Sequence, residues 1–227
     1  MRKAATILTT LALIGAAPAA SQEHESAVGD YSGNAMETAS GLRISADGTF
    51  QYYLSVGALD LRAAGTWERQ GDLIRFTSDP KPVPAEFVWK GFRTTPDAPF
   101  LAIVTGAQGK PFDYASLTVV CANGAHISEQ AQLGIWSPSE DDECDQPEKV
   151  KLRLGMYDIE SRPFDLNGPL KPAAGQTIVF EFLPNDIGTA DFSEVTGTLT
   201  EEGMTITGPL GEQSLRRIEM RSETPDN

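Results

Sequence analysis

Apolar and polar residues alternate through most of the chain between residues 41 and 77. Phe50, Tyr52 and Leu54 share one parity, which is the period-two pattern of a strand with one buried face. Asp47-Gly48 comes just before this run and tolerates the positive φ angles of a tight hairpin turn. The stretch therefore predicts four antiparallel strands, at residues 41–45, 50–56, 59–67 and 73–77.

A four-stranded meander leaves its apolar face uncovered, so a second layer or closure into a barrel must bury that face. The same strand and turn pattern returns near the C-terminus, at residues 195–200, 204–207 and 214–220. We expect these late strands to complete the first unit, which then comprises residues 28–84 and 187–220.

A second β unit is predicted at residues 98–185. Three prolines in Asp79–Pro84 mark its boundary, because proline cannot donate to a sheet ladder. Strand patterns follow at residues 100–105, 116–121, 150–156 and 176–183, and no amphipathic helix interrupts them. The fold class is all-β: an antiparallel meander barrel or sandwich with an inserted second β-sandwich, two β domains in tandem being the alternative.

Two short resemblances agree with this reading. The segments Leu42–Phe50 and Gly65–Asp72 resemble the small periplasmic barrels of the lipocalin-like and copper-resistance lipoprotein kind. Gly109 and Pro111, followed by alternating apolar residues and by Gly134-Ile135-Trp136, resemble the transthyretin-like or carboxypeptidase-regulatory sandwich. The resemblances imply a barrel for the first unit and an immunoglobulin- or transthyretin-like sandwich for the second.

Residues 1–21 have the features of a secretory signal peptide. Arg2-Lys3 is basic, Ala4–Ala16 is apolar, and small residues follow at Ala17–Ser21. The apolar run is shorter than the roughly 20 residues that a membrane-spanning helix needs. We therefore expect a periplasmic or secreted protein with no membrane insertion, and a flexible tail at residues 221–227.

The formal net charge of the chain is −14. Loss of the two basic residues of the signal peptide would make it about −16. Nucleic acids and anionic membranes attract cationic surfaces, so neither is expected as a partner. Basic proteins and cations are compatible with this charge, and so is an acidic surface that serves only solubility.

Cys121 and Cys144 are the two cysteines of the chain. An even count in an exported protein favours a disulfide, with two buried free thiols as the alternative. Closing a loop of about 23 residues is worth about 3 to 3.5 kcal/mol in the chain-entropy model.

Most catalytic chemistries lack their residues here. His24 and His126 are the only histidines, so a multi-histidine zinc site is excluded. No G-x-S-x-G nucleophile elbow and no phosphate-binding glycine loop occurs, and oxidised cysteines cannot act as nucleophiles. We expect no catalytic residue, no metal and no cofactor.

One local feature is a candidate for ligand binding. The acidic residues Glu140, Asp141, Asp142, Glu143 and Asp145 surround Cys144, and Trp136 precedes them. Carboxylates could hold calcium or a basic partner, but adjacent carboxylates on a loop also simply face water. The Trp136 ring could stack on a sugar, or pack in the core.

These observations favour a non-catalytic binding or interaction protein of the periplasm or cell envelope, whose partner is an unknown protein or glycan. An inhibitor of a basic envelope enzyme such as lysozyme is one alternative. The other is a carboxylate-dependent hydrolase, which requires acidic side chains that converge in a concave pocket.

Overall fold

The computed structural model describes residues 27–95, 101–139, 143–144, 146–208 and 211–218. Its elements are strands, apart from two short 3₁₀ turns at Ala107–Gly109 and Gly155–Tyr157. The all-β prediction is confirmed. Among the described residues, no helix is long and apolar enough to cross a membrane.

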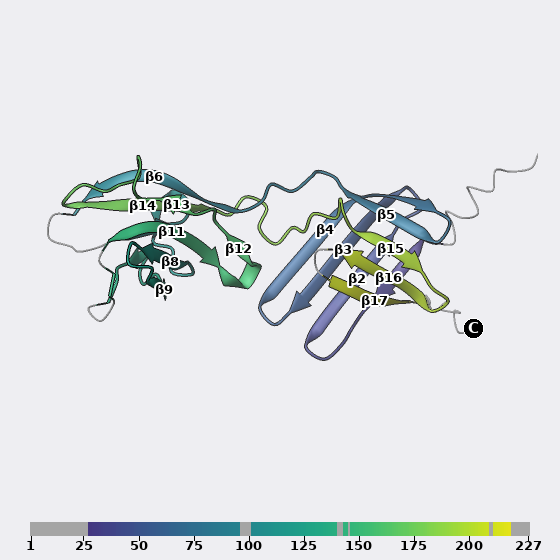
Figure 1. Ribbon diagram of the computed structural model, residues 1–227. Coiled ribbons are helices and arrows are strands. Elements are labelled where there is room, and N and C mark those ends of the chain that lie inside the picture. The colour runs from purple at the N-terminus through teal and green to yellow at the C-terminus, as the bar shows by residue number, and fades with distance from the viewer. Residues whose placement is uncertain (1–26, 96–100, 140–142, 145, 209–210, 219–227) are drawn as a thin grey trace, which may run out of the picture.

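Eight strands close into an antiparallel barrel, in the order β1-β17-β16-β15-β5-β4-β3-β2 (Figure 1). Five come early in the chain: β1 (Gly29–Ser32), β2 (Thr38–Ile44), β3 (Thr49–Val56), β4 (Leu59–Gln70) and β5 (Leu73–Ser78). Three come late: β15 (Thr196–Leu199), β16 (Gly203–Gly208) and β17 (Gly211–Arg217). The barrel closes because β15 pairs with β5 and β17 pairs with β1.

The interior of the barrel is a packed core of alternate strand residues. Phe50, Tyr52 and Phe76 point inward, and each is at most 3% exposed. Phe192, from the segment that leads into β15, enters this core and lies with its ring centroid 4.8 Å from that of Tyr52 and 5.4 Å from that of Phe50. The barrel is therefore filled by its own aromatic side chains.

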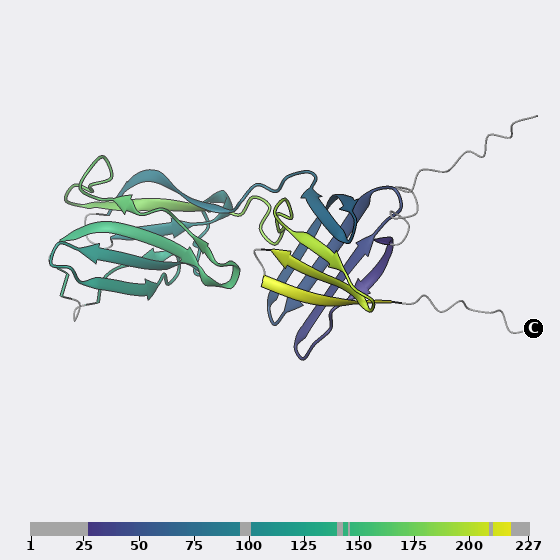
Figure 2. The same cartoon turned by 45° about the vertical axis from the view of Figure 1, so that its right-hand side comes forward.

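The chain between β5 and β15 forms two further sheets that share one apolar core (Figure 2). The first has the order β10-β7-β14-β6 and consists of β6 (Glu86–Thr94), β7 (Ala102–Thr105), β10 (Ile135–Trp136) and β14 (Gln176–Leu183). The second consists of β8 (Ser116–Cys121), β9 (His126–Gln130), β11 (Pro147–Leu154), β12 (Ile159–Glu160) and β13 (Phe164–Asp165). We call this pair of sheets the sandwich.

The predicted disulfide is confirmed. It joins Cys121, at the end of β8, to Cys144, and the two Cα atoms are 5.5 Å apart. It therefore ties Cys144, which precedes β11, to the end of β8.

Two segments connect the barrel with the sandwich, residues 79–85 and residues 184–195, and they run side by side (Figures 1 and 2). The Val83 N–H donates to Asp186 Oδ2 at 2.8 Å, and the Asp186 N–H donates to the Val83 carbonyl at 3.1 Å. The second segment also pairs with β4, because Ala190 N–H donates to the Arg62 carbonyl at 2.8 Å. Hydrogen bonds therefore tie the two connections to each other and to the barrel.

Candidate functional site

A hollow lies at the open side of the sandwich, where the edges of the two sheets face each other. Its volume is about 700 Å³. One wall is the start of β6, and the other is the segment from Glu160 to Phe164. We call this hollow the edge groove.

A β-bulge in β6 shapes one wall of the edge groove. Trp89 lies opposite Phe180 and Gly91 lies opposite Val179, so Lys90 has no partner in the register. Such a bulge bends the strand and re-aims its side chains. Phe87 and Trp89 both precede the unpaired Lys90; Phe87 is buried, whereas Trp89 lies at the rim and is 39% exposed.

Local contacts hold the Trp89 ring in place. Its Nε1–H donates to the Gly91 carbonyl at 3.1 Å, across the bulge. Its ring meets that of Phe92 edge-on, with centroids 5.7 Å apart. An indole fixed in this way offers an exposed apolar face at little cost in side-chain entropy.

The opposite wall is tied firmly to β11. The Ser161 N–H donates to the Leu152 carbonyl at 2.8 Å, and the Leu152 N–H donates back to Ser161 Oγ at 3.0 Å. Glu160 forms an ion pair with Lys151 at 2.8 Å. The edge groove therefore has an apolar base, of which buried Phe87 is part, and a polar rim of Glu86, Glu160, Ser161 and Arg162.

A second hollow lies between the barrel and the sandwich and has a volume of about 490 Å³. The barrel contributes Leu61, the sandwich contributes Tyr157 and Ile159, and both connecting segments complete the lining. We call this hollow the junction cavity. Most of its lining side chains are apolar, and its charged residues are Lys81, Asp186 and Asp191.

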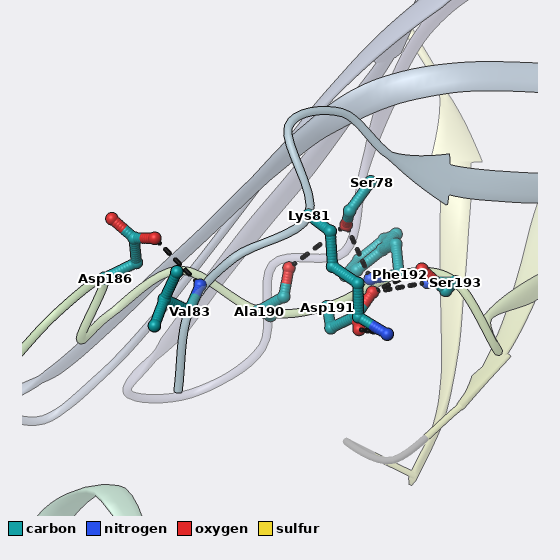
Figure 3. A network of polar contacts seen from close by, with 8 residues as sticks. All are labelled: Ser78, Lys81, Val83, Asp186, Ala190, Asp191, Phe192 and Ser193. Atoms are coloured by element: carbon teal, nitrogen blue, oxygen red, sulfur yellow. Dashed lines mark hydrogen bonds and ion pairs between the residues drawn. The ribbon is translucent and has the colours of Figure 1, made fainter. Parts of the chain in front are cut away.

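Figure 3 shows the polar contacts that hold the junction cavity together. Buried Ser78, the last residue of β5, ties the second connection to the barrel, since its Oγ accepts the Phe192 N–H at 2.8 Å. The Asp191 carboxylate accepts the N–H and the Oγ–H of Ser193, and these bonds, followed by nearby Lys81, hold the pKa of Asp191 below its usual value. Asp191 is therefore ionised at neutral pH.

Comparisons with protein-family models, curated proteins and solved structures return no match for this chain. The resemblances to lipocalin-like barrels and transthyretin-like sandwiches therefore stay predictions. What the two hollows can do has to be argued from their own side chains.

Of the predicted binding residues, the structure describes Trp136 and Glu143. Trp136 lies in the sandwich core, 2% exposed, so it presents no ring face for stacking, and packing describes its role. Glu143 is exposed beside the disulfide. The remaining acidic residues, Glu140, Asp141, Asp142 and Asp145, lie outside the described residues. Within the described ranges, no group of three or more metal-ligating side chains is found.

Trp89 is the residue that the sequence did not single out. Trp67 and Trp136 are both at most 3% exposed, so Trp89 is the exposed one of the three tryptophans. Parity alone places Trp89 on the same face as buried Phe87. The Gly91 that follows two residues later was the available signal, because glycine inside a strand often marks a bulge.

Proposed function

We propose that the protein is a non-catalytic binding protein of the cell envelope and that it holds an extended polypeptide segment of its partner in the edge groove. The observation that carries this proposal is the exposed Trp89 on β6, an edge strand that borders the groove. Tryptophan is among the residues that contribute most to binding energy in interfaces. The envelope location follows from the predicted signal peptide.

The backbone of β6 supports strand addition. The Thr95 N–H donates to the Gly175 carbonyl at 2.9 Å, which fixes the alternation of the ladder between β6 and β14. By that alternation, the N–H groups of Phe92 and Thr94 point away from β14. The carbonyl groups of an extended peptide beside β6 would accept hydrogen bonds from these two N–H groups, as in other complexes in which a strand joins a sheet edge.

The rigidity of the groove also favours binding. Both walls are fixed by hydrogen bonds before any ligand arrives, so little ordering is required of the protein. Glu86 and Arg162 on the rim carry opposite charges and can orient a polar backbone or a charged side chain.

A carboxylate-dependent hydrolase is the second candidate, because Glu86 and Glu160 both line the edge groove. Glu160 forms an ion pair with Lys151, and this pairing suits a structural role. An inhibitor of a basic enzyme is a special case of the main proposal, with the partner's loop in the groove.

The test starts from a library of random peptides displayed on phage, selected on the full-length mature protein and counter-selected on Trp89→Ala. Selected peptides should bind in solution and change the tryptophan emission. Thr94→Pro should weaken binding at least about threefold because it removes an outward N–H, whereas Thr94→Ala should not.

A glycan array and a set of glycoside and peptide substrates form the other arms. The proposal fails if no selected peptide depends on Trp89, if only glycans change the emission, or if a substrate is turned over and Glu86→Gln abolishes the turnover. Melting curves of each variant establish that it folds.

A further inference from the structure

The junction cavity is a second site, separate from the edge groove. Domain junctions are common places for small-molecule sites, and a volume of about 490 Å³ suits a small ligand. Leu61, Val83 and Ile159 come from the barrel, the first connection and the sandwich, so a ligand there would contact all three parts.

The sequence explains why the two connections leave this space open. Pro80, Pro82 and Pro84 alternate along the first connection and have no N–H, so it cannot form a continuous ladder with the second. Val83 supplies the one N–H between Pro82 and Pro84, and that group is bonded to Asp186 Oδ2. The apolar side chains are therefore held apart and line a cavity.

The charged groups of the cavity have an excess of negative charge. Asp186 and Asp191 face one cation, Lys81, whose Nζ lies 3.5 Å from Asp191 Oδ2. The Lys81 side chain is 74% exposed, so most of it lies in solvent. The formal net charge of −14 adds a field that attracts cations to the same place.

The Asp186 carboxylate can accept a further hydrogen bond. One oxygen, Oδ2, accepts the Val83 N–H, and within the described part of the chain Oδ1 has no hydrogen-bond donor. Figure 3 shows the second oxygen turned away from Val83. The position of Asp186 is fixed by a turn, because Thr189 N–H donates to its carbonyl at 2.9 Å.

We infer that the junction cavity binds a small organic cation, an amine with an apolar chain or ring. The apolar part contacts Leu61, Val83 and Ile159, and the ammonium group lies beside Oδ1 of the Asp186 carboxylate. Such a ligand satisfies both properties of the cavity, its apolar lining and its surplus carboxylate.

Three probes that share one chain separate these contributions: octylammonium, 1-octanol and octanoate, each below its micellar concentration. Isothermal titration on the mature protein should give the tightest binding for octylammonium, about two- to fivefold tighter than 1-octanol, and the weakest for octanoate. Equal affinity for all three, preference for octanoate, or no binding would overturn the inference.

Two substitutions locate the binding. Asp186→Asn keeps an oxygen to accept the Val83 N–H and removes the charge, so it should abolish the preference for octylammonium over 1-octanol. Val83→Ser should weaken the binding of octylammonium and of 1-octanol by the same factor, about two- to threefold, because it removes apolar contact. The Val83 side chain is 55% exposed, so this variant should fold.

Glu129→Gln is the matched control, since it removes the same formal charge from exposed β9, away from the cavity. It should leave all three affinities unchanged. If Glu129→Gln weakens octylammonium binding as much as Asp186→Asn does, the affinity depends only on the net charge of the protein and the inference is wrong. If Val83→Ser leaves the affinity for octylammonium unchanged, the inference is also wrong.

Discussion

Ile159 and Glu160 are neighbours on β12, yet they line different hollows: Ile159 lines the junction cavity and Glu160 lines the edge groove. Successive residues of a strand point to opposite faces, so this short strand forms a wall between the two. Ala85, at the start of the sandwich, lines both hollows. A ligand in one hollow therefore contacts the wall of the other.

This shared wall predicts coupling between the two proposed sites. A ligand that orders β12 from the junction cavity reduces the ordering that a peptide in the edge groove must impose. Saturating octylammonium should raise the affinity of the protein for a selected peptide about fivefold. The peptide should raise the affinity for octylammonium by the same factor. Titration of each ligand in the presence of the other measures both factors, and independent affinities would contradict the coupling.

Trp67 and Trp136 are both buried but differ in hydrogen bonding. Trp67 Nε1–H donates to the Ser45 carbonyl at 3.0 Å, whereas Trp136 Nε1–H has no acceptor among the described residues. Replacement by phenylalanine removes the same group in both cases. Trp67→Phe should therefore cost about 1 kcal/mol more than Trp136→Phe, because only Trp67→Phe breaks a hydrogen bond; the Ser45 carbonyl still accepts the Gly48 N–H at 3.2 Å.

Urea unfolding with separate probes for the barrel and the sandwich measures this difference. Trp67 lies in the barrel core and Trp136 in the sandwich core, so each substitution removes the tryptophan of its own unit, and hydrogen exchange of the strand amides in each unit serves as the probe instead. Equal losses in the two variants would mean that the Trp136 N–H is satisfied in the folded protein.

Leu133 lies in a turn whose left-handed backbone conformation favours asparagine over leucine. Gln132 and Ile135 exchange backbone hydrogen bonds of 2.8 and 2.9 Å, so Leu133-Gly134 is a two-residue hairpin turn. Leu133 has a φ of 51°, and its side chain is 74% exposed. Asparagine tolerates this conformation far better than leucine, so Leu133→Asn should stabilise the protein by about 1 kcal/mol.

Leu133→Ala is the control, because it removes the exposed side chain without favouring the left-handed conformation. Its free energy of unfolding should stay close to that of the wild type. If Leu133→Ala stabilises as much as Leu133→Asn, the gain comes from the lost leucine side chain and not from the turn.

The disulfide should stabilise the sandwich and leave the barrel unaffected. It closes a loop that spans 23 residues, all within the middle part of the chain. In the chain-entropy model, Cys121→Ala with Cys144→Ala should lower the free energy of unfolding by about 3 kcal/mol. The two units are expected to give separate transitions, and a shift in the barrel transition would contradict this assignment.

The sequence predicts the barrel strands well because their pattern is local. Phe50 and Tyr52 are buried and Gln51 is exposed, as alternation requires. The edge groove could not be predicted in this way, since it depends on the register between β6 and β14, which lie far apart in the chain. Trp89 lies opposite buried Phe180 and is still 39% exposed, because its exposure depends on what the second sheet places over it.

The two hollows could not be found from the local sequence for a related reason. A run of carboxylates is visible in any sequence, whereas a concave surface exists only once distant strands are packed. The residues that line the junction cavity, such as Leu61, Val83 and Ile159, are ordinary apolar residues of three separate segments. Nothing in their local pattern distinguishes them from core residues.

Phe192 allows a last prediction, because it joins the connecting segment to the barrel core. It is 1% exposed and its ring packs against those of Phe50, Tyr52 and Phe76. Phe192→Ala should cost about 3 to 5 kcal/mol through lost contacts and the void left behind, and Phe192→Leu less than about 2 kcal/mol. Both variants keep the backbone N–H that donates to Ser78 Oγ.

The void in Phe192→Ala should also bind a small apolar molecule, since empty cavities lined by apolar side chains stay dry and admit such ligands. Benzene should therefore raise the melting temperature of Phe192→Ala and leave that of the wild type unchanged. If benzene has no effect on Phe192→Ala, the barrel has collapsed around the missing ring. A destabilisation under about 2 kcal/mol would support the same explanation, because the cost of such a substitution falls as the cavity closes.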